Sequence, residues 1–153
     1  RIVCGDGLLE VYRLLSGDPE AVPRTGAVPA PDDPNAAVAE AGLRGSDPVA
    51  ERAVERFLSL YGAAAGDLAL AVGAVGGVYV GGGIAPKLMP RLRDGGFLDA
   101  FRSKGRLAAY MERIPVRVLL EPRAALLGAA ARAARRTPRP LPSAPRGRAE
   151  RSR

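Results

Sequence analysis

The sequence predicts an α/β fold in which short buried strands alternate with amphipathic helices. The strongest helical signal follows Asp47-Pro48, where apolar residues recur every three or four positions along one face for about 25 residues. Two short runs read as strands, Val78–Val80 and the segment 115–120, because they alternate apolar residues with others and are rich in valine. A glycine run follows the first strand and leads into another helix.

The other elements follow from local signals. Residues 8–15 predict a short amphipathic helix that begins at a glycine turn and ends at residues 16–19. Residues 17–34 hold five prolines and predict a surface loop. Asp33-Pro34 and Asp47-Pro48 each predict a helix start, with a carboxylate at the N-cap and proline at the first helical position.

Glycines mark the boundaries of the remaining helices. The long helix is predicted to end near Gly73, and Gly62 and Gly66 inside it predict a kink or a close helix contact. A helix should start at about Ala85 and break at the glycine pair 95–96, before a short helix that contains Phe97, Leu98 and Phe101. After the second strand, an alanine-rich helix is expected from Arg123 to about Ala134.

The net charge of +7 belongs mostly to the tail. Seven arginines lie from Arg135 onward against the single acid Glu150, so the rest of the chain is close to neutral. The prolines, arginines and small polar residues of 137–153 predict disorder. This distribution argues against a nucleic-acid-binding fold, which would carry its charge on structured faces.

Two absences exclude several kinds of chemistry. The sequence has no histidine, so it contains no Ser-His-Asp triad and no histidine metal site. Cys4 is the only cysteine, which excludes an internal disulfide and a cysteine zinc cluster, and a packing role is expected for it. No apolar run reaches the roughly 20 residues of a membrane span. We therefore expect a soluble, cytoplasmic protein, and the missing initiator methionine suggests that other residues precede Arg1.

Only the strand–glycine–helix unit around residues 78–90 suggests a site. Successive glycines let a ligand approach the backbone, and a helix N-terminus offers unpaired N–H groups to phosphate. The same glycines also suit a tight turn or close packing, so spacing leaves both interpretations open. The unit is not a Rossmann fingerprint, because Pro86 stands where the third glycine belongs, and it is not a Walker A motif around Lys87.

The order of several motifs resembles the second half of bacterial ATP-dependent glucokinases. The match covers roughly residues 1–134 and excludes the arginine tail. Its most specific parts are the glycine segment and the Lys-Gly-Arg stretch. The motifs are Gly5-x-Gly7-Leu8 with Tyr12, Gly76-Gly77-Val78-Tyr79-Val80-Gly81-Gly82-Gly83-Ile84-Ala85-Pro86, Phe97–Phe101 with Lys104-Gly105-Arg106, Ile114-Pro115-Val116, and Leu126-Leu127-Gly128-Ala129-Ala130.

The resemblance implies the C-terminal half of a ribonuclease-H-like fold of the actin-like ATPase and hexokinase superfamily. It also implies that the chain has three parts. Residues 1–120 would belong to the large domain with the adenosine-motif strand, turn and helix. Residues 121–136 would form a C-terminal helix that packs back toward the hinge and small domain, and 137–153 the disordered tail.

The glycine segment resembles the adenosine motif of this family. The resemblance therefore implies nucleotide contacts for six residues, the last of which follows the glycine run. They are Gly76, Gly77, Gly81, Gly82, Gly83 and Ile84.

The resemblance also implies ATP and Mg²⁺ as cofactors and glucose as the substrate, phosphorylated at its 6-hydroxyl. The family's catalytic base, both phosphate loops and sugar motif belong upstream, so no catalytic or metal-binding residue is assigned in this chain, and the chain alone should have little activity. A homodimer stays open, whereas membrane and nucleic-acid partners are not expected. The alternative is a non-catalytic nucleotide-binding or sugar-responsive regulatory relative of the same superfamily.

Several charged residues have a structural interpretation beside a functional one. Lys87, Arg91 and Arg93 follow the glycine turn and could approach a phosphate, although a solvated helix face is the simpler interpretation. For Lys104 and Arg106 a structural ion pair or a subunit contact is expected.

Overall fold

A computed structural model describes residues 6–23 and 33–135 of the chain. The expectations for Cys4, for half of the proline-rich loop and for the tail lie outside these residues. The described elements are α1 (Gly7–Ser16), α2 (Pro34–Arg44), α3 (Pro48–Val72), β1 (Val78–Val80), α4 (Ile84–Lys87), α5 (Met89–Arg93), α6 (Gly96–Arg102), the 3₁₀ turn η1 (Gly105–Leu107), α7 (Ala108–Glu112), β2 (Val116–Val118) and α8 (Ala124–Ala134).

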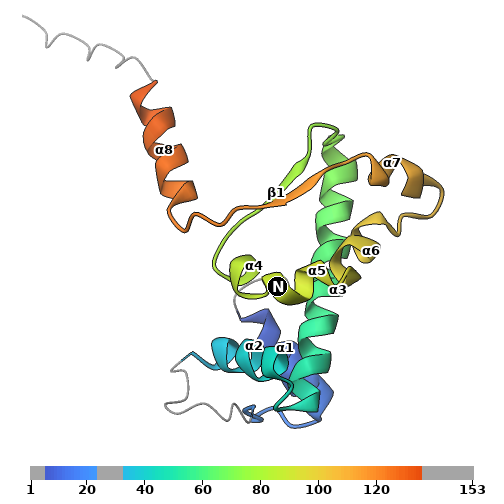
Figure 1. Ribbon diagram of the computed structural model, residues 1–153, viewed down its shortest axis with the longest axis vertical. Helices are drawn as coiled ribbons and strands as arrows, with labels where there is room; N and C mark the ends of the chain where they lie inside the picture. Colours follow the sequence, from blue (N-terminus) through green and yellow to red (C-terminus); the bar gives the residue numbers. More distant parts are fainter. Residues whose placement is uncertain (1–5, 24–32, 136–153) are drawn as a thin grey trace, which may run out of the picture. The chain divides into compact units, whose positions relative to one another are not determined.

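Helix α3 is the element on which most described helices of the first unit pack (Figure 1). Helices α1, α2 and α6 all pack on it, and α6 makes the most extensive contact. The apolar face that the sequence predicts for this helix supplies the buried side chains Val54, Phe57 and Leu58. The aromatic rings continue from Tyr61 to Phe97 of α6, with centroids 5.5 Å apart in an edge-to-face arrangement.

Helices α3 and α6 approach so closely that side chains are excluded at two positions. A Cβ atom on Gly62 would collide with the carbonyl oxygen of Phe97, and one on Gly66 with that of Phe101. Both Phe97 and Phe101 are buried there. The two glycines therefore serve the close helix contact that the sequence predicts as one of two alternatives.

The helix caps behave as the sequence predicts. The Asp33 carboxylate accepts a hydrogen bond from the Asn35 backbone N–H at 3.0 Å, at the start of α2. The Asp47 carboxylate accepts from the backbone N–H groups of Val49 and Ala50 at 2.8 and 3.1 Å. Asp47 is buried, and the Tyr12 hydroxyl donates to its other oxygen at 2.9 Å, which links α1 to the start of α3.

The two strands form a parallel sheet in which Val78 pairs with Val116 and Val80 with Val118. The first strand has the bounds that the sequence predicts, and the second is shorter than the predicted segment 115–120. Long helix α3 ends at Gly73, as expected, in a left-handed conformation with φ 61°.

Two expectations about helices need correction. The helix expected from about Ala85 to the glycine pair is divided into α4 and α5 at Leu88, since Pro90 lacks an N–H and its ring conflicts with the carbonyl four residues earlier. The turn η1 and helix α7 have no counterpart in the sequence prediction, because their residues show no clear period.

By compactness the chain divides into residues 1–122 and residues 123–153. In the second unit the described structure is helix α8, which agrees with the predicted alanine-rich helix. Among the described residues, no helix combines the length and apolar character needed to cross a membrane.

The close α3–α6 contact gives the first testable prediction. We expect Gly62→Ala to lower the free energy of unfolding by about 1–3 kcal/mol, because the added methyl group has no room beside the Phe97 carbonyl. The matched control is Gly128→Ala, in a helix interior where a Cβ meets nothing within 4 Å. Urea unfolding of both variants measures the effect, and equal stability of Gly62→Ala and the wild type would contradict the contact.

Candidate functional site

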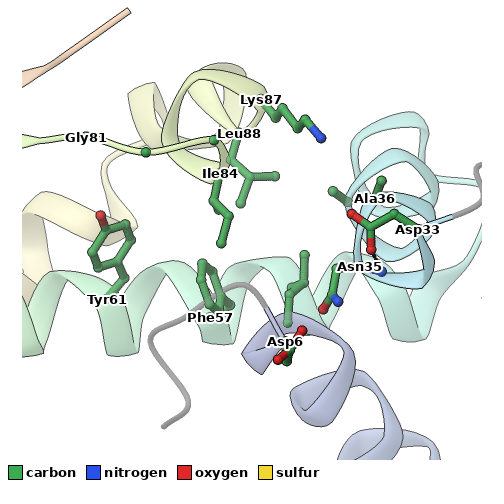
Figure 2. A pocket seen from close by; sticks show the side chains of 14 residues that line it. Asp6, Asp33, Asn35, Ala36, Phe57, Tyr61, Gly81, Ile84, Lys87 and Leu88 are labelled. Atoms are coloured by element: carbon green, nitrogen blue, oxygen red, sulfur yellow. Dashed lines mark hydrogen bonds between the residues drawn. The ribbon is translucent and has the colours of Figure 1, made fainter. Parts of the chain in front are cut away.

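The glycine segment lines a pocket of about 470 Å³ (Figure 2). Its size lies within the usual range for small-molecule sites. Five parts of the first unit meet there: the start of α1, the start of α2, the middle of α3, the glycine turn and α4. The lining consists of Asp6, Leu8, Asp33, Asn35, Ala36, Ala39, Phe57, Tyr61, Gly81, Gly82, Gly83, Ile84, Lys87 and Leu88.

The glycine turn provides a wall of exposed backbone. A Cβ on Gly82 or on Gly83 would project into open space, whereas one on Gly81 would meet the Leu119 side chain at 3.3 Å. Gly82 has φ 97°, a conformation that side-chain-bearing residues rarely adopt. A ligand can thus approach the backbone of Gly82 and Gly83 without meeting a side chain.

Aromatic and aliphatic side chains line the α3 side of the pocket. In Figure 2 the Phe57 ring lies below Ile84, and Tyr61 lies beneath the glycine strand. The Phe57 and Tyr61 ring centroids are 5.9 Å apart. Phe57 is buried and Tyr61 is half-buried, so of these two rings Tyr61 is the one that a ligand can reach. Burial raises the pKa of the Tyr61 hydroxyl above its usual value, which keeps it neutral and able to donate a hydrogen bond.

The polar groups of the pocket are divided between its sides. Lys87 comes from α4, whereas Asp6 and Asp33 come from the starts of α1 and α2. Asn35 joins these two helices, because its Oδ1 accepts a hydrogen bond from the Leu9 backbone N–H at 3.0 Å. Since Asp6 makes no side-chain capping bond to α1, Asn35 serves as a cap for α1 from the neighbouring helix.

The structure separates the six residues predicted to contact a nucleotide. Gly81, Gly82, Gly83 and Ile84 line the pocket. The pair 76–77 lies at the other end of β1, about 10 Å away by the rise of a three-residue strand. There the second glycine has φ 118°, and its backbone N–H donates to the Ala74 carbonyl at 2.9 Å. Gly76 and Gly77 therefore form the turn from α3 into the strand.

The charged residues that follow the glycine turn have different surroundings. Lys87 is exposed yet lines the pocket. Arg91 forms a salt bridge with Glu51, and its pKa is raised above the usual value chiefly by the hydrogen bond to that carboxylate. Arg93 is exposed and outside the pocket lining. Arg91 thus ties α5 to α3, which leaves Lys87 as the cation of this group in the pocket.

Lys104 has the structural role that was expected as the default. Its ammonium donates to the Ala63 carbonyl at 2.9 Å and forms a salt bridge with Asp67 at 2.7 Å. These contacts hold the segment after α6 against α3.

Sequence reasoning missed most of the pocket lining. Asp33 has a clear helix-capping signal, which says nothing of a second role in a pocket. Phe57 and Tyr61 lie four residues apart on the apolar face of a helix, a spacing that is equally typical of an ordinary core. Asn35 could have been found only from the meeting of α1 and α2, which no local pattern indicates.

The described residues contain no cluster suited to a metal ion. Within 6–23 and 33–135, no three Asp, Glu or Cys side chains come together.

Comparison with known proteins identifies the family. A family model described as "Glucokinase" matches residues 1–136. The chain belongs to the glucokinase family. Curated glucokinases from Trichormus variabilis and Mesorhizobium japonicum are 39% and 45% identical to it, over 88% and 86% of this chain.

A solved structure has the same fold as much of this chain. The crystal structure of a glucokinase from an Antarctic psychrotroph matches 83% of it with a TM-score of 0.67 and 31% identity. The chain spans 43% and 36% of the two curated glucokinases and 37% of the crystallised one, so it corresponds to less than half of each relative.

The cap that Asn35 of α2 provides for α1 gives a prediction about the pocket wall. We expect Asn35→Ala to lower the free energy of unfolding by about 1 kcal/mol, since the Leu9 N–H loses its acceptor. Asn35→Asp keeps an acceptor oxygen and should retain most of the stability. Thermal unfolding of the two variants checks this, and the cap would be refuted if the alanine and aspartate variants unfolded at the same temperature.

Proposed function

We propose that the pocket beside the glycine turn receives the nucleoside part of ATP in a glucokinase. The observation that carries the proposal is that Gly82 and Gly83, whose Cβ positions are open, line one pocket with the half-buried Tyr61 ring. Bare backbone and one accessible aromatic ring suit a flat, mostly apolar base, and a few polar groups at the margin suit a ribose. Membership in the glucokinase family supports ATP as the ligand.

In the complete enzyme, we infer, the γ-phosphoryl group of ATP passes to the 6-hydroxyl of glucose. Such a transfer depends on positioning and on charge stabilisation around the transferred group. The described residues contribute to positioning: the glycine turn admits the nucleotide, and Lys87 supplies a positive charge near the pocket. In the complete enzyme, Mg²⁺ would be held in part by the phosphate oxygens of ATP.

We further propose that this chain contributes part of a larger ribonuclease-H-like domain of the actin-like ATPase type. Two observations support it. The described sheet has only two strands, and several large apolar side chains of α3 and β1 are exposed, among them Leu68, Val72 and Tyr79 at 65%, 68% and 60%. Residues outside this chain would extend the sheet and cover these side chains, consistent with the greater length of the relatives.

A pair of glycine variants tests the proposed nucleotide pocket. We expect Gly83→Val to weaken ADP binding at least about tenfold, because it adds a side chain at a residue that lines the pocket, in open space and at a negative φ that valine adopts without strain. Gly76→Val is the matched control, since its Cβ also meets nothing but lies outside the lining. Isothermal titration calorimetry with ADP measures both, and equal weakening by the two variants would contradict this placement.

The proposed division of the active site predicts the behaviour of the isolated chain. In an assay that couples glucose 6-phosphate formation to NADPH, the purified 153-residue chain should give no turnover with glucose and Mg-ATP, while still binding ADP. The physical reason is that the residues for catalysis and glucose binding lie outside this chain in the proposal. Robust turnover would overturn that division.

A further inference from the structure

The pocket is polarised, with a cation on one wall and carboxylates on the other. Figure 2 shows the Lys87 ammonium and the Asp33 carboxylate extending toward each other from α4 and from the start of α2. Asp6 adds a second carboxylate on the α1 side. Phe57 and Tyr61 of α3 line the pocket below these two groups in Figure 2.

Both principal charges are available to a ligand. Within the described part of the chain, Lys87 has neither a salt bridge nor a hydrogen bond. One oxygen of Asp33 caps α2 through the Asn35 N–H at 3.0 Å, and the other oxygen has no partner among those residues. The pocket thus offers a donor with positive charge on one side and an acceptor with negative charge on the other.

These two groups impose opposite demands on a nucleotide. A phosphate group carries negative charge and only accepts hydrogen bonds at neutral pH, so it is attracted by the ammonium and repelled by the carboxylate. The nucleoside part is neutral and carries hydrogen-bond donors, on the ribose hydroxyls and the exocyclic amine of adenine. These donors match a carboxylate.

We propose that Asp33 and Lys87 fix the direction in which a nucleotide lies in this pocket. The nucleoside lies against the α2 wall and donates a hydrogen bond to Asp33, and the phosphates lie on the Lys87 side. The inference rests on the proposed function, since it concerns the orientation of the same ligand. It assigns a specificity-determining role to a residue whose sequence signal is only that of a helix cap.

The reverse orientation predicts the opposite result for one substitution, which makes the test decisive. In the proposed orientation, Asp33→Asn weakens the binding of both adenosine and ADP by about three- to tenfold, because a charge-assisted hydrogen bond becomes a neutral one. In the reverse orientation, phosphates would face Asp33, so the same substitution would strengthen ADP binding and leave adenosine unchanged. Asparagine also caps helices well, so α2 is preserved.

Lys87 supplies the second arm of the experiment. Lys87→Gln should weaken ADP binding about fivefold, as expected for an exposed charge pair, and leave adenosine binding within about twofold. Calorimetric titrations of the full 153-residue chain with adenosine and with metal-free ADP measure these effects. Arg93→Gln and Asp18→Asn are matched controls that make the same charge changes at exposed positions outside the lining.

Two further measurements complete the test. Asp33→Ser retains a capping oxygen without the charge and should weaken adenosine as Asp33→Asn does, with melting temperature as the check on folding. Loss of the Asp33 effect with 2′-deoxyadenosine identifies a ribose hydroxyl as the donor, and loss with inosine identifies the exocyclic amine; either supports the proposal.

The outcomes separate this inference from the proposed function. Stronger ADP binding by Asp33→Asn, or unchanged ADP binding by Lys87→Gln, overturns the orientation while the nucleotide pocket stands. If the folded wild-type chain binds neither adenosine nor ADP, the proposed pocket function fails, and the orientation fails with it.

Discussion

The close approach of α6 to α3 is the constraint on which the rest of the first unit depends. The carbonyl oxygens of Phe97 and Phe101 occupy the space where side chains of residues 62 and 66 would be. Only glycine permits this distance, and the close approach allows a row of packed aromatic rings that runs from Phe57 through Tyr61 and Phe97 to Phe101. Because Phe57 and Tyr61 also line the pocket, the packing that stabilises the fold fixes one wall of the candidate site.

Two polar residues at the start of α2 also serve both the fold and the pocket. Asp33 caps α2 and also presents an oxygen to the pocket, and Asn35 lines the pocket while it caps α1. Polar groups with such dual roles are held in place by bonds to the backbone, so little side-chain freedom remains to be lost when a ligand binds. The pocket is therefore preorganised on the α1 and α2 side, whereas the long side chain of Lys87 leaves the α4 side adaptable.

Most helices could be predicted because their signals are local. Asp33-Pro34, Asp47-Pro48, Gly73 and the glycine pair 95–96 mark boundaries by capping and backbone chemistry that acts within a few residues. The pocket could be predicted only in part, since its walls come from five segments that tertiary packing brings together. Tyr61 illustrates the difference: its spacing shows that it faces inward, but not that a cavity lies beside it.

The glycine segment shows why a motif must be divided by geometry before it is assigned a role. Gly77 and Gly82 both have positive φ, so each is required by its backbone conformation. The first faces the Pro115 carbonyl across the sheet, and the second faces open space. Gly77 therefore shapes the entry into strand β1, and Gly82 leaves the turn after β1 without a side chain on the pocket side. If the proposed function is right, strand β1 connects the structural turn at Gly77 to the turn at Gly82 that faces the ligand. Three residues are enough for this connection because pairing with β2 holds both ends of β1.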